Sequence, residues 1–302
     1  MNKRNQAYLY LVFASAIWGI ALPLIKKGYE QTTPMQFLFF RYLFAVLVSL
    51  PILIILWPKI KIKAKHIPEL IGIGLLANFI SHILMYIGLD KTSTVETSLL
   101  GSLTPILIVL GGAFFLREKI TKNEKIGIII VFLGSLLVVL EPLFLNGQGL
   151  SFDHTLGNTM ILANCFTWGG AMLWMKKVAH KYHPLGITLI SFIPTTVAYL
   201  ITLLIMDPKL VNLDIFSQPI ALSAALFQGI LGSVLALFLY QYAQREVEAS
   251  EATLFHYLVP LFSIPLAIIW LHEMPSTLFI IGGLIIIIGI VIAEKRWKGK
   301  SH

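Results

Sequence analysis

The chain has 302 residues, of which 57% are apolar and 13% are charged, and its mean hydropathy is +0.83. One soluble domain of this length could not cover so much apolar surface, so the composition excludes a soluble enzyme or binding protein and predicts an integral membrane protein. The net charge of +8 does not indicate nucleic-acid binding, because the basic residues stand at the ends of apolar stretches and not on a patch with interleaved aromatic residues.

Ten apolar stretches are each long enough to cross about 30 Å of hydrocarbon at about 1.5 Å per residue. The expected helices cover residues 7–25, 34–57, 68–89, 93–116, 122–141, 156–175, 184–206, 218–243, 249–271 and 275–293. The longest loops between them, 142–155 and 207–217, are too short for a nucleotide-hydrolysing domain or another extramembrane enzyme. We therefore expect an all-α polytopic membrane protein with ten transmembrane helices.

The Lys and Arg residues divide unequally between the two sides of these helices. The opposite loops hold only Lys26, Lys27, Lys91 and Lys209, whereas alternate segments are rich in basic residues, at 3–4, 59–65, 117–125, 176–181, 245 and 295–300. The positive-inside rule then makes both termini cytoplasmic. No small-residue cleavage site precedes Lys26, so we do not expect a cleaved signal peptide. The prediction is a multi-pass protein of the cell (inner or plasma) membrane.

The sequence repeats itself near its midpoint. Trp18-Gly19 and Trp168-Gly169 lie 150 positions apart, as do Pro34 and Pro184. Further along the offset is 155, which pairs Gly74 with Gly229, Glu96 with Glu251, Pro105 with Pro260, Glu118 with Glu273, Gly127 with Gly282 and Gly134 with Gly289. Each copy holds five spans, and this odd number would insert the second copy upside down relative to the first. We expect two inverted five-helix repeats, residues 1–145 and 146–302.

Proline and glycine mark these helices at matched positions. Pro105 and Pro260 would bend equivalent helices and free backbone carbonyls around a central cavity, or they are kinks that serve packing alone. The glycines of spans 122–141 and 275–293 lie seven apart on one helical face and predict close helix contacts. Inverted repeats of this kind enclose a site near the bilayer midplane and expose it to each side in turn.

Trp-Gly in spans 7–25 and 156–175, Phe37-x-x-x-Arg41-x-x-x-Ala45, and the repeated order Pro, Glu, Gly, Gly form one pattern over the whole chain. This pattern resembles the EamA family of the drug/metabolite transporter superfamily. The resemblance implies export or exchange of small metabolites, often amino acids, without ATP hydrolysis. Ser191 stands at the position equivalent to Arg41, so the role of this arginine is not duplicated.

Polar side chains at membrane depth are costly to bury, which makes them the first candidates for function. Asn78 precedes His82 by four residues, and Asn164 precedes Trp168 by four, so each pair shares a helical face. For the tryptophans plain packing is the alternative, and for the histidines a structural role. With comparable polar and aromatic stripes elsewhere, the residues expected to bind substrate are Trp18, Asn78, His82, Asn164, Trp168, Tyr240, His256 and Tyr257.

Two interpretations are open for Glu96 and for Arg41. Glu96 and Glu251 are expected to couple transport to protons, since intramembrane carboxylates often serve proton relays. Ser93-x-x-Glu96 is also a capping box, which would satisfy the first amides of its own helix. Arg41 either attracts an anionic group or fixes its helix. Glu118 and Glu273 should each place a carboxylate at the positive start of the next helix.

The lone Cys165 excludes a disulfide framework and a thiolate metal site. The sequence has no His-Glu-x-x-His and no Gly-x-Ser-x-Gly, so we expect neither an enzyme nor a metal or other cofactor. We expect a secondary transporter that exports or exchanges small metabolites, with amino acids first. Its partners would be this substrate, the lipid bilayer, and protons or an exchanged solute. An uptake carrier and a passive channel of the same fold are the alternatives.

Overall fold

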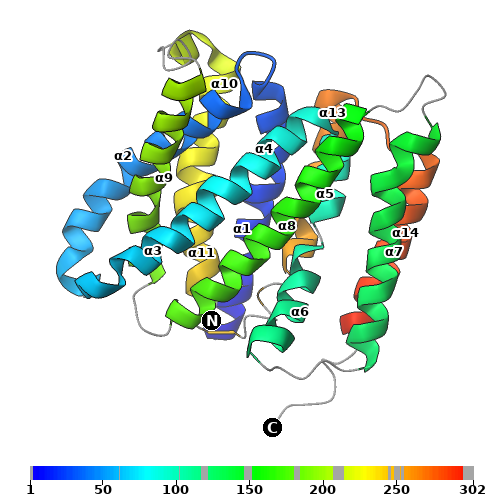
Figure 1. Ribbon diagram of the computed structural model, residues 1–302, viewed down its shortest axis with the longest axis horizontal. Coiled ribbons are helices and arrows are strands. Elements are labelled where there is room, and N and C mark those ends of the chain that lie inside the picture. Colours follow the sequence, from blue (N-terminus) through cyan, green and yellow to red (C-terminus); the bar gives the residue numbers. More distant parts are fainter. Residues whose placement is uncertain are drawn as a thin grey trace.

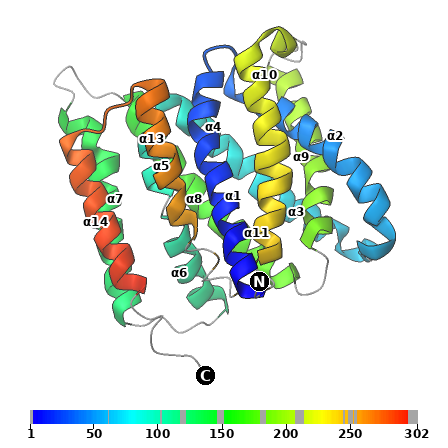
Figure 2. The ribbon, with the colours of Figure 1, turned by 180° about the vertical axis from the view of Figure 1, so that it is seen from behind.

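The structure is a computed structural model that describes residues 3–60, 62–101, 103–116, 122–145, 152–179, 184–206, 214–243, 246–247, 252 and 255–294. This described part of the chain is helical and contains no strand. Figures 1 and 2 show the long helices side by side, with α1 beginning at the lower end of both views.

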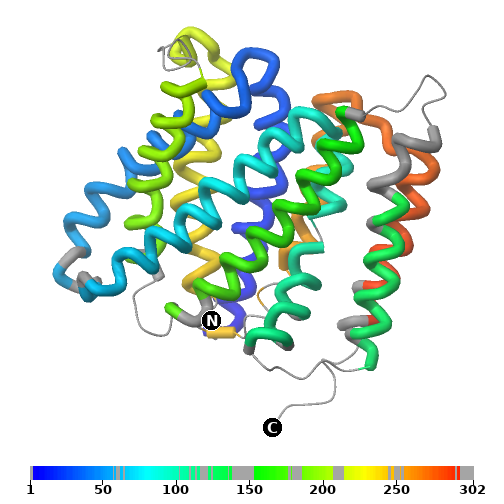
Figure 3. Tube along the Cα trace, viewed as in Figure 1, coloured from blue at the N-terminus to red at the C-terminus, as the bar shows by residue number. Residues whose placement is uncertain are grey.

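The first half of the chain is a succession of helical segments. In order these are α1 (Lys3–Gly28), α2 (Pro34–Ile60), the 3-10 turn η1 (Ala64–His66), α3 (Ile67–Gly74), η2 (Leu75–Ile80), α4 (Ser81–Lys91), α5 (Thr94–Gly101), α6 (Thr104–Leu116) and α7 (Lys122–Leu145). Segment η2 is a π-helix, in which each backbone bond spans one residue more than in an α-helix. The trace nevertheless continues in one direction from α3 to α4 (Figure 3).

The second half follows the same order. It consists of α8 (Phe152–Ala179), α9 (Pro184–Met206), the 3-10 turn η4 (Asp214–Ser217), α10 (Pro219–Leu226), the π-helix η5 (Phe227–Leu235), α11 (Ala236–Ala243), the 3-10 turn η6 (Phe255–Leu258), α13 (Val259–Leu271) and α14 (Thr277–Glu294). The span predicted at 218–243 is therefore interrupted by a π-helix, as is the span predicted at 68–89.

Six helical stretches in the described part of the chain are long and apolar enough to cross a membrane. They cover Lys3–Gly28, Pro34–Leu56, Ile67–Lys91, Thr94–Gly112, Gly186–Met206 and Pro219–Ala243. Shorter apolar helices lie at Lys125–Gly134, Phe255–Leu271 and Thr277–Gly289. The prediction of an all-helical fold with several crossing helices is thus confirmed, while the number ten stays a prediction.

Helices from the two halves pack against each other throughout. Helix α1 packs on α11 and α13, α8 packs on α4 and α6, and α2 packs on α9. Helices α7 and α14 form a separate pair at one edge of the molecule (Figures 1 and 2). A Cβ at Gly134 would lie 2.9 Å from the Gly282 carbonyl oxygen, and one at Gly289 would lie 2.8 Å from that of Gly127. The close contact predicted for these glycines is confirmed.

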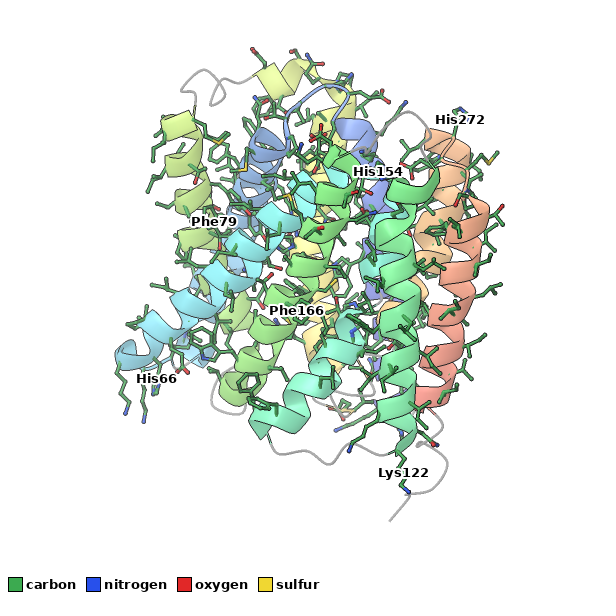
Figure 4. All side chains as sticks on the ribbon, turned by 45° about the vertical axis from the view of Figure 1, so that its right-hand side comes forward. His66, Phe79, Lys122, His154, Phe166 and His272 are labelled. Atoms are coloured by element: carbon green, nitrogen blue, oxygen red, sulfur yellow. The ribbon has the colours of Figure 1, made fainter. Side chains whose placement is uncertain are left out.

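The surface of the bundle carries many large apolar side chains. Phe114 is 81% exposed, Ile205 79% and Phe166 62%, and Figure 4 shows Phe166 on the outer face of α8. Soluble monomers rarely expose such extensive apolar surface, whereas a lipid-facing surface is made of it. Figure 4 also places His66 and Lys122 at one end of the bundle and His154 and His272 at the other.

Candidate functional site

A cavity of about 150 Å³ lies at the centre of the bundle, between the two halves of the chain. Its lining comes from α1, α2 and η2–α6 of the first half and from α8, α9, η5, α11, η6 and α13 of the second. A cavity of about this volume can hold a benzene-sized molecule. The helices of the two halves therefore enclose a space that is large enough for a small organic solute.

Most of the side chains predicted to bind substrate face this space. Those in the lining are Trp18, Asn78, His82, Asn164, Trp168 and His256. Tyr240 lies behind the wall, where its ring centroid is 5.5 Å from that of Trp18 and 5.0 Å from that of His256. Tyr257, in η6, is half-buried and outside the lining. Substrate contact by any of the eight stays a prediction.

The two tryptophans of the repeat each meet a histidine from the other half of the chain. Trp18 of α1 stacks on His256 of η6, with centroids 5.2 Å apart and planes at 4°. Trp168 of α8 meets His82 of α4 edge-on, at 5.4 Å and 77°. The Trp18 Nε1–H also donates to the Gly232 carbonyl in η5 at 3.0 Å. Two aromatic pairs therefore join the halves at the cavity.

The two lining asparagines hold helices together through their Nδ2 groups. Asn78 donates to Ser191 Oγ at 3.0 Å, and Asn164 donates to the carbonyl and the hydroxyl of Ser81 at 2.8 and 2.7 Å. These bonds satisfy polar groups that would otherwise be costly to bury. They also tie the π-helical region of the first half to α9 and α8.

Sequence reasoning left Arg41 undecided and did not select its neighbours. Arg41 is 4% exposed and lines the cavity. Its Nε donates to Ser233 Oγ at 3.0 Å, and its Nη1 donates to the Tyr86 hydroxyl at 2.5 Å. Gln228 lines the same space from η5. A glutamine inside the apolar stretch 218–243 was the available signal for this part of the site.

Glu96 lies in a polar network at the start of α5 and not in the cavity lining. Its Oε2 accepts from the Ser93 N–H at 3.2 Å, and its own N–H donates to Ser93 Oγ at 3.0 Å, so the predicted capping box is confirmed. Thr92 Oγ1 and Asn158 Nδ2 donate to the carboxylate at 2.7 and 3.1 Å, and His154 Nε2 lies 3.4 Å from it. The other predicted coupling residue, Glu251, lies outside the described residues.

Glu273 caps a helix, but not the one that was predicted. Its two carboxylate oxygens accept the N–H groups of Thr94 and Val95, each at 3.0 Å. The carboxylate therefore stands at the start of α5, in the other half of the chain, whereas the prediction placed it at the start of the next helix, α14. The packing of α13 on α5 brings the loop before α14 to this helix end. Glu118 lies outside the described residues.

The sequence profile of the EamA-like transporter family matches residues 5–140 and 155–294. An uncharacterized transporter of Archaeoglobus fulgidus is 28% identical over 299 residues, which cover 96% of this chain and 99% of the relative. A probable terminal-alkyne amino-acid exporter of Streptantibioticus cattleyicolor is 24% identical over 303 residues, which cover 99% of this chain and 97% of the relative.

An uncharacterized transporter of Bacillus subtilis is 26% identical over 275 residues, covering 91% of this chain and 86% of the relative. One solved crystal structure has the same fold, with a TM-score of 0.69 at 17% identity over 98% of this chain and 99% of that one. The profile spans both halves of the sequence, on either side of the central cavity. The chain belongs to the EamA-like transporter family.

Proposed function

We propose that this membrane transporter is a secondary carrier that exports or exchanges a small amphipathic metabolite, with amino acids and related compounds first. The observation that carries the proposal is the cavity between the two halves, with a tryptophan of the repeat from each half in its wall. Binding there and rocking of the helices would expose the solute to each side in turn. The relative named as a probable amino-acid exporter supports the substrate class.

Equivalent contacts in the two halves support an inverted ten-helix repeat. Helix α1 packs on α11 and α13, and its equivalent α8 packs on α4 and α6. A Cβ at Gly74 would meet Ser191 Cβ at 2.5 Å, and one at the equivalent Gly229 would meet the carbonyl oxygen of Arg41, the counterpart of Ser191, at 2.6 Å. The π-helices η2 and η5 overlap under the same offset. In such a repeat, equivalent helices of the two halves would close the cavity toward the two sides of the membrane.

The distribution of charge supports an orientation. His66, which directly follows the basic segment 59–65, and Lys122 of the basic segment 117–125 stand at the end of the bundle opposite to His154 and His272 (Figure 4). Basic segments remain on the cytoplasmic side of a cell membrane, so both termini would be cytoplasmic. Orientation does not fix the direction of flux, and uptake is the second carrier function that this cavity supports.

A thermal-shift screen of the detergent-purified chain against a metabolite panel would test the proposal. A ligand that binds the folded state raises the melting temperature. The solutes that raise it should then enter protein-containing liposomes with saturable kinetics. A channel of the same fold would give flux that rises linearly with concentration, and transport of none of the metabolites would contradict the carrier proposal itself.

Proton coupling through Glu251, with Glu96, is a separate part of the proposal. A carboxylate that exchanges its proton during the cycle makes transport depend on pH. We expect Glu251→Gln to flatten the pH dependence of counterflow. An unchanged pH profile in this variant would end the coupling proposal. Glu96→Gln serves for comparison, and if Glu96 only caps α5 it should lower stability and leave the profile unchanged.

A further inference from the structure

The guanidinium of Arg41 is buried beside the cavity without a counter-ion among the residues that the structure describes. Its hydrogen bonds to Ser233 and Tyr86 occupy Nε and one position of Nη1, and its Nη2 makes no hydrogen bond to a described residue. Moving a charged group out of water into a protein interior costs on the order of several kcal/mol unless the charge is paired. A negative group that enters the cavity would supply the missing partner.

The surroundings of Arg41 hold this cation in one orientation. Its central guanidinium carbon lies 4.9 Å from the centre of the Tyr42 ring and 5.3 Å from that of Tyr86, and both tyrosines are fully buried. Aromatic faces attract a cation but do not neutralise it. The hydrogen bonds of Arg41 leave both N–H groups of Nη2 and one of Nη1 without a partner among the described residues, and adjacent N–H groups of a planar guanidinium form a fork that can bind a carboxylate through two parallel hydrogen bonds.

Gln228 brings a second unsatisfied group to the same cavity. The side chain of Gln228 is 5% exposed and lines the cavity, and its Oε1 is buried without a hydrogen-bond partner among the described residues. Ser233 connects the two residues, because its hydroxyl accepts from Arg41 and donates to the backbone carbonyl of Gln228 at 2.9 Å. A buried unpaired acceptor is costly, and a hydroxyl or N–H group of a ligand would satisfy it.

The rest of the lining offers no carboxylate to a cationic ligand within the described residues. The position equivalent to Arg41 is Ser191, which accepts from Asn78 just as Ser233 accepts from Arg41. The positive charge therefore stands on one side of the cavity. A charged ligand would bind such a site in a single orientation, with its anionic group at Arg41.

We infer that Arg41 and Gln228 form a subsite for the carboxylate and a neighbouring hydrogen-bond donor of a small organic acid. This inference rests on the proposed carrier function and narrows its substrate class. The carboxylate is required for binding, whereas a free amine meets no opposite charge among the described lining residues. An aromatic or aliphatic body would lie between the Trp18 and Trp168 walls.

Four probes with the same phenylethyl body would test the subsite on the full purified chain: 3-phenylpropanoate, L-phenylalanine, 3-phenylpropanamide and phenethylamine. Calorimetric titration should give the tightest binding for 3-phenylpropanoate, with the amide and the amine weaker by at least about tenfold, since a hydrogen bond to a charged group contributes about 1.5–3 kcal/mol. Arg41→Gln should weaken the two carboxylates by about 10- to 100-fold. It should leave the amide unchanged.

Arg41→Lys keeps the charge but not the fork, and we expect an intermediate loss for the carboxylates. Lys27→Gln is the matched control, because Lys27 pairs with Glu30 at an exposed position on the same protein. If the Arg41 variants do not fold, the order of affinities of the four probes, measured on the unaltered chain and on Gln228→Ala, tests the subsite instead. Gln228→Ala should weaken L-phenylalanine, which has a donor beside its carboxylate, more than 3-phenylpropanoate.

Equal affinity for the carboxylate and its amide, or no binding of either carboxylate, would overturn the assignment of Arg41. Saturable transport of phenethylamine or the amide in preference to the acids would overturn it too, while leaving the carrier function in place. Absence of saturable flux for every metabolite in the wider panel would instead contradict the proposed function.

Discussion

The imidazole of His256 lies parallel to the indole of Trp18, with ring centroids 5.2 Å apart and planes at 4°. The equivalent Trp168 stacks on no ring among the described residues and meets His82 with its edge. The same Trp-Gly pair in the two repeats thus builds two different walls. The consequence is a cavity whose two sides are distinguishable to a ligand, although the helices around them correspond.

Trp18→Phe should weaken ligand binding several-fold. Phenylalanine keeps a ring against His256 but loses the N–H that donates to the Gly232 carbonyl at 3.0 Å, and one such bond contributes about 1 kcal/mol. The affinity for the most stabilising solute of the screen measures the effect. Trp270→Phe is the control, since Trp270 is 43% exposed on α13. Equal losses in the two variants would contradict a role for Trp18 in the wall.

Gly229→Ala should destabilise the fold, whereas Gly170→Ala should not. A Cβ at 229 would lie 2.6 Å from the Arg41 carbonyl oxygen and 3.0 Å from Phe44 Cβ, so α2 and η5 would have to separate. Overpacking of this kind costs about 1–3 kcal/mol. A Cβ at 170 would meet nothing within 4 Å. Melting temperatures in detergent compare the two variants, and an unchanged Gly229→Ala would show that the helices are not in close contact there.

Glu273→Gln should loosen the start of α5 in particular. An amide oxygen can replace only one of the two acceptors for the Thr94 and Val95 N–H groups, and the charge that favours a helix N-terminus is lost. We expect a loss of about 0.5–2 kcal/mol, the range seen for helix caps. Hydrogen exchange at residues 94–96 measures it, with Glu30→Gln as control. Unchanged exchange there would exclude the cap.

Lys26→Met should destabilise the protein while the neighbouring Lys27→Met has little effect. The Lys26 ammonium donates to the carbonyls of Leu89, Asp90 and Thr92 at 2.6, 2.9 and 2.8 Å, and so holds the end of α4 to α1. Carbonyls at a helix end favour a cation, and charge-assisted bonds contribute about 1.5–3 kcal/mol. Exposed Lys27 bonds only Glu30 among the described residues. Similar melting temperatures for the two variants would contradict this difference.

The all-helical fold, the family resemblance and six of the residues that line the cavity were predictable from the sequence. Tryptophan and glycine are rare enough in a Leu- and Ile-rich chain for equal spacings to be informative, and positions four apart identify a helical face, as with Asn78 and His82. The capping box at Ser93 and Glu96 was also predictable, because its partners are three residues apart.

What could not be predicted depends on contacts between distant residues. One partner of Arg41 is Ser233, 192 positions away, and Glu273 caps α5 from 179 positions away. The π-helical turn η2 has no local signal either; the Tyr199 hydroxyl donates to the Asn78 and Phe79 carbonyls there, from another helix. Spacing within one stretch of sequence carries no information on such pairs.

Counterflow in liposomes that contain the purified chain tests the central claim most directly. Vesicles loaded with the most stabilising solute are diluted into a trace of the same labelled solute, and uptake of the label is followed over time. A carrier with one central cavity exposed alternately to each side predicts a transient accumulation of label that saturates with concentration and requires the solute inside. Uptake that is linear in concentration and indifferent to the internal solute would contradict it.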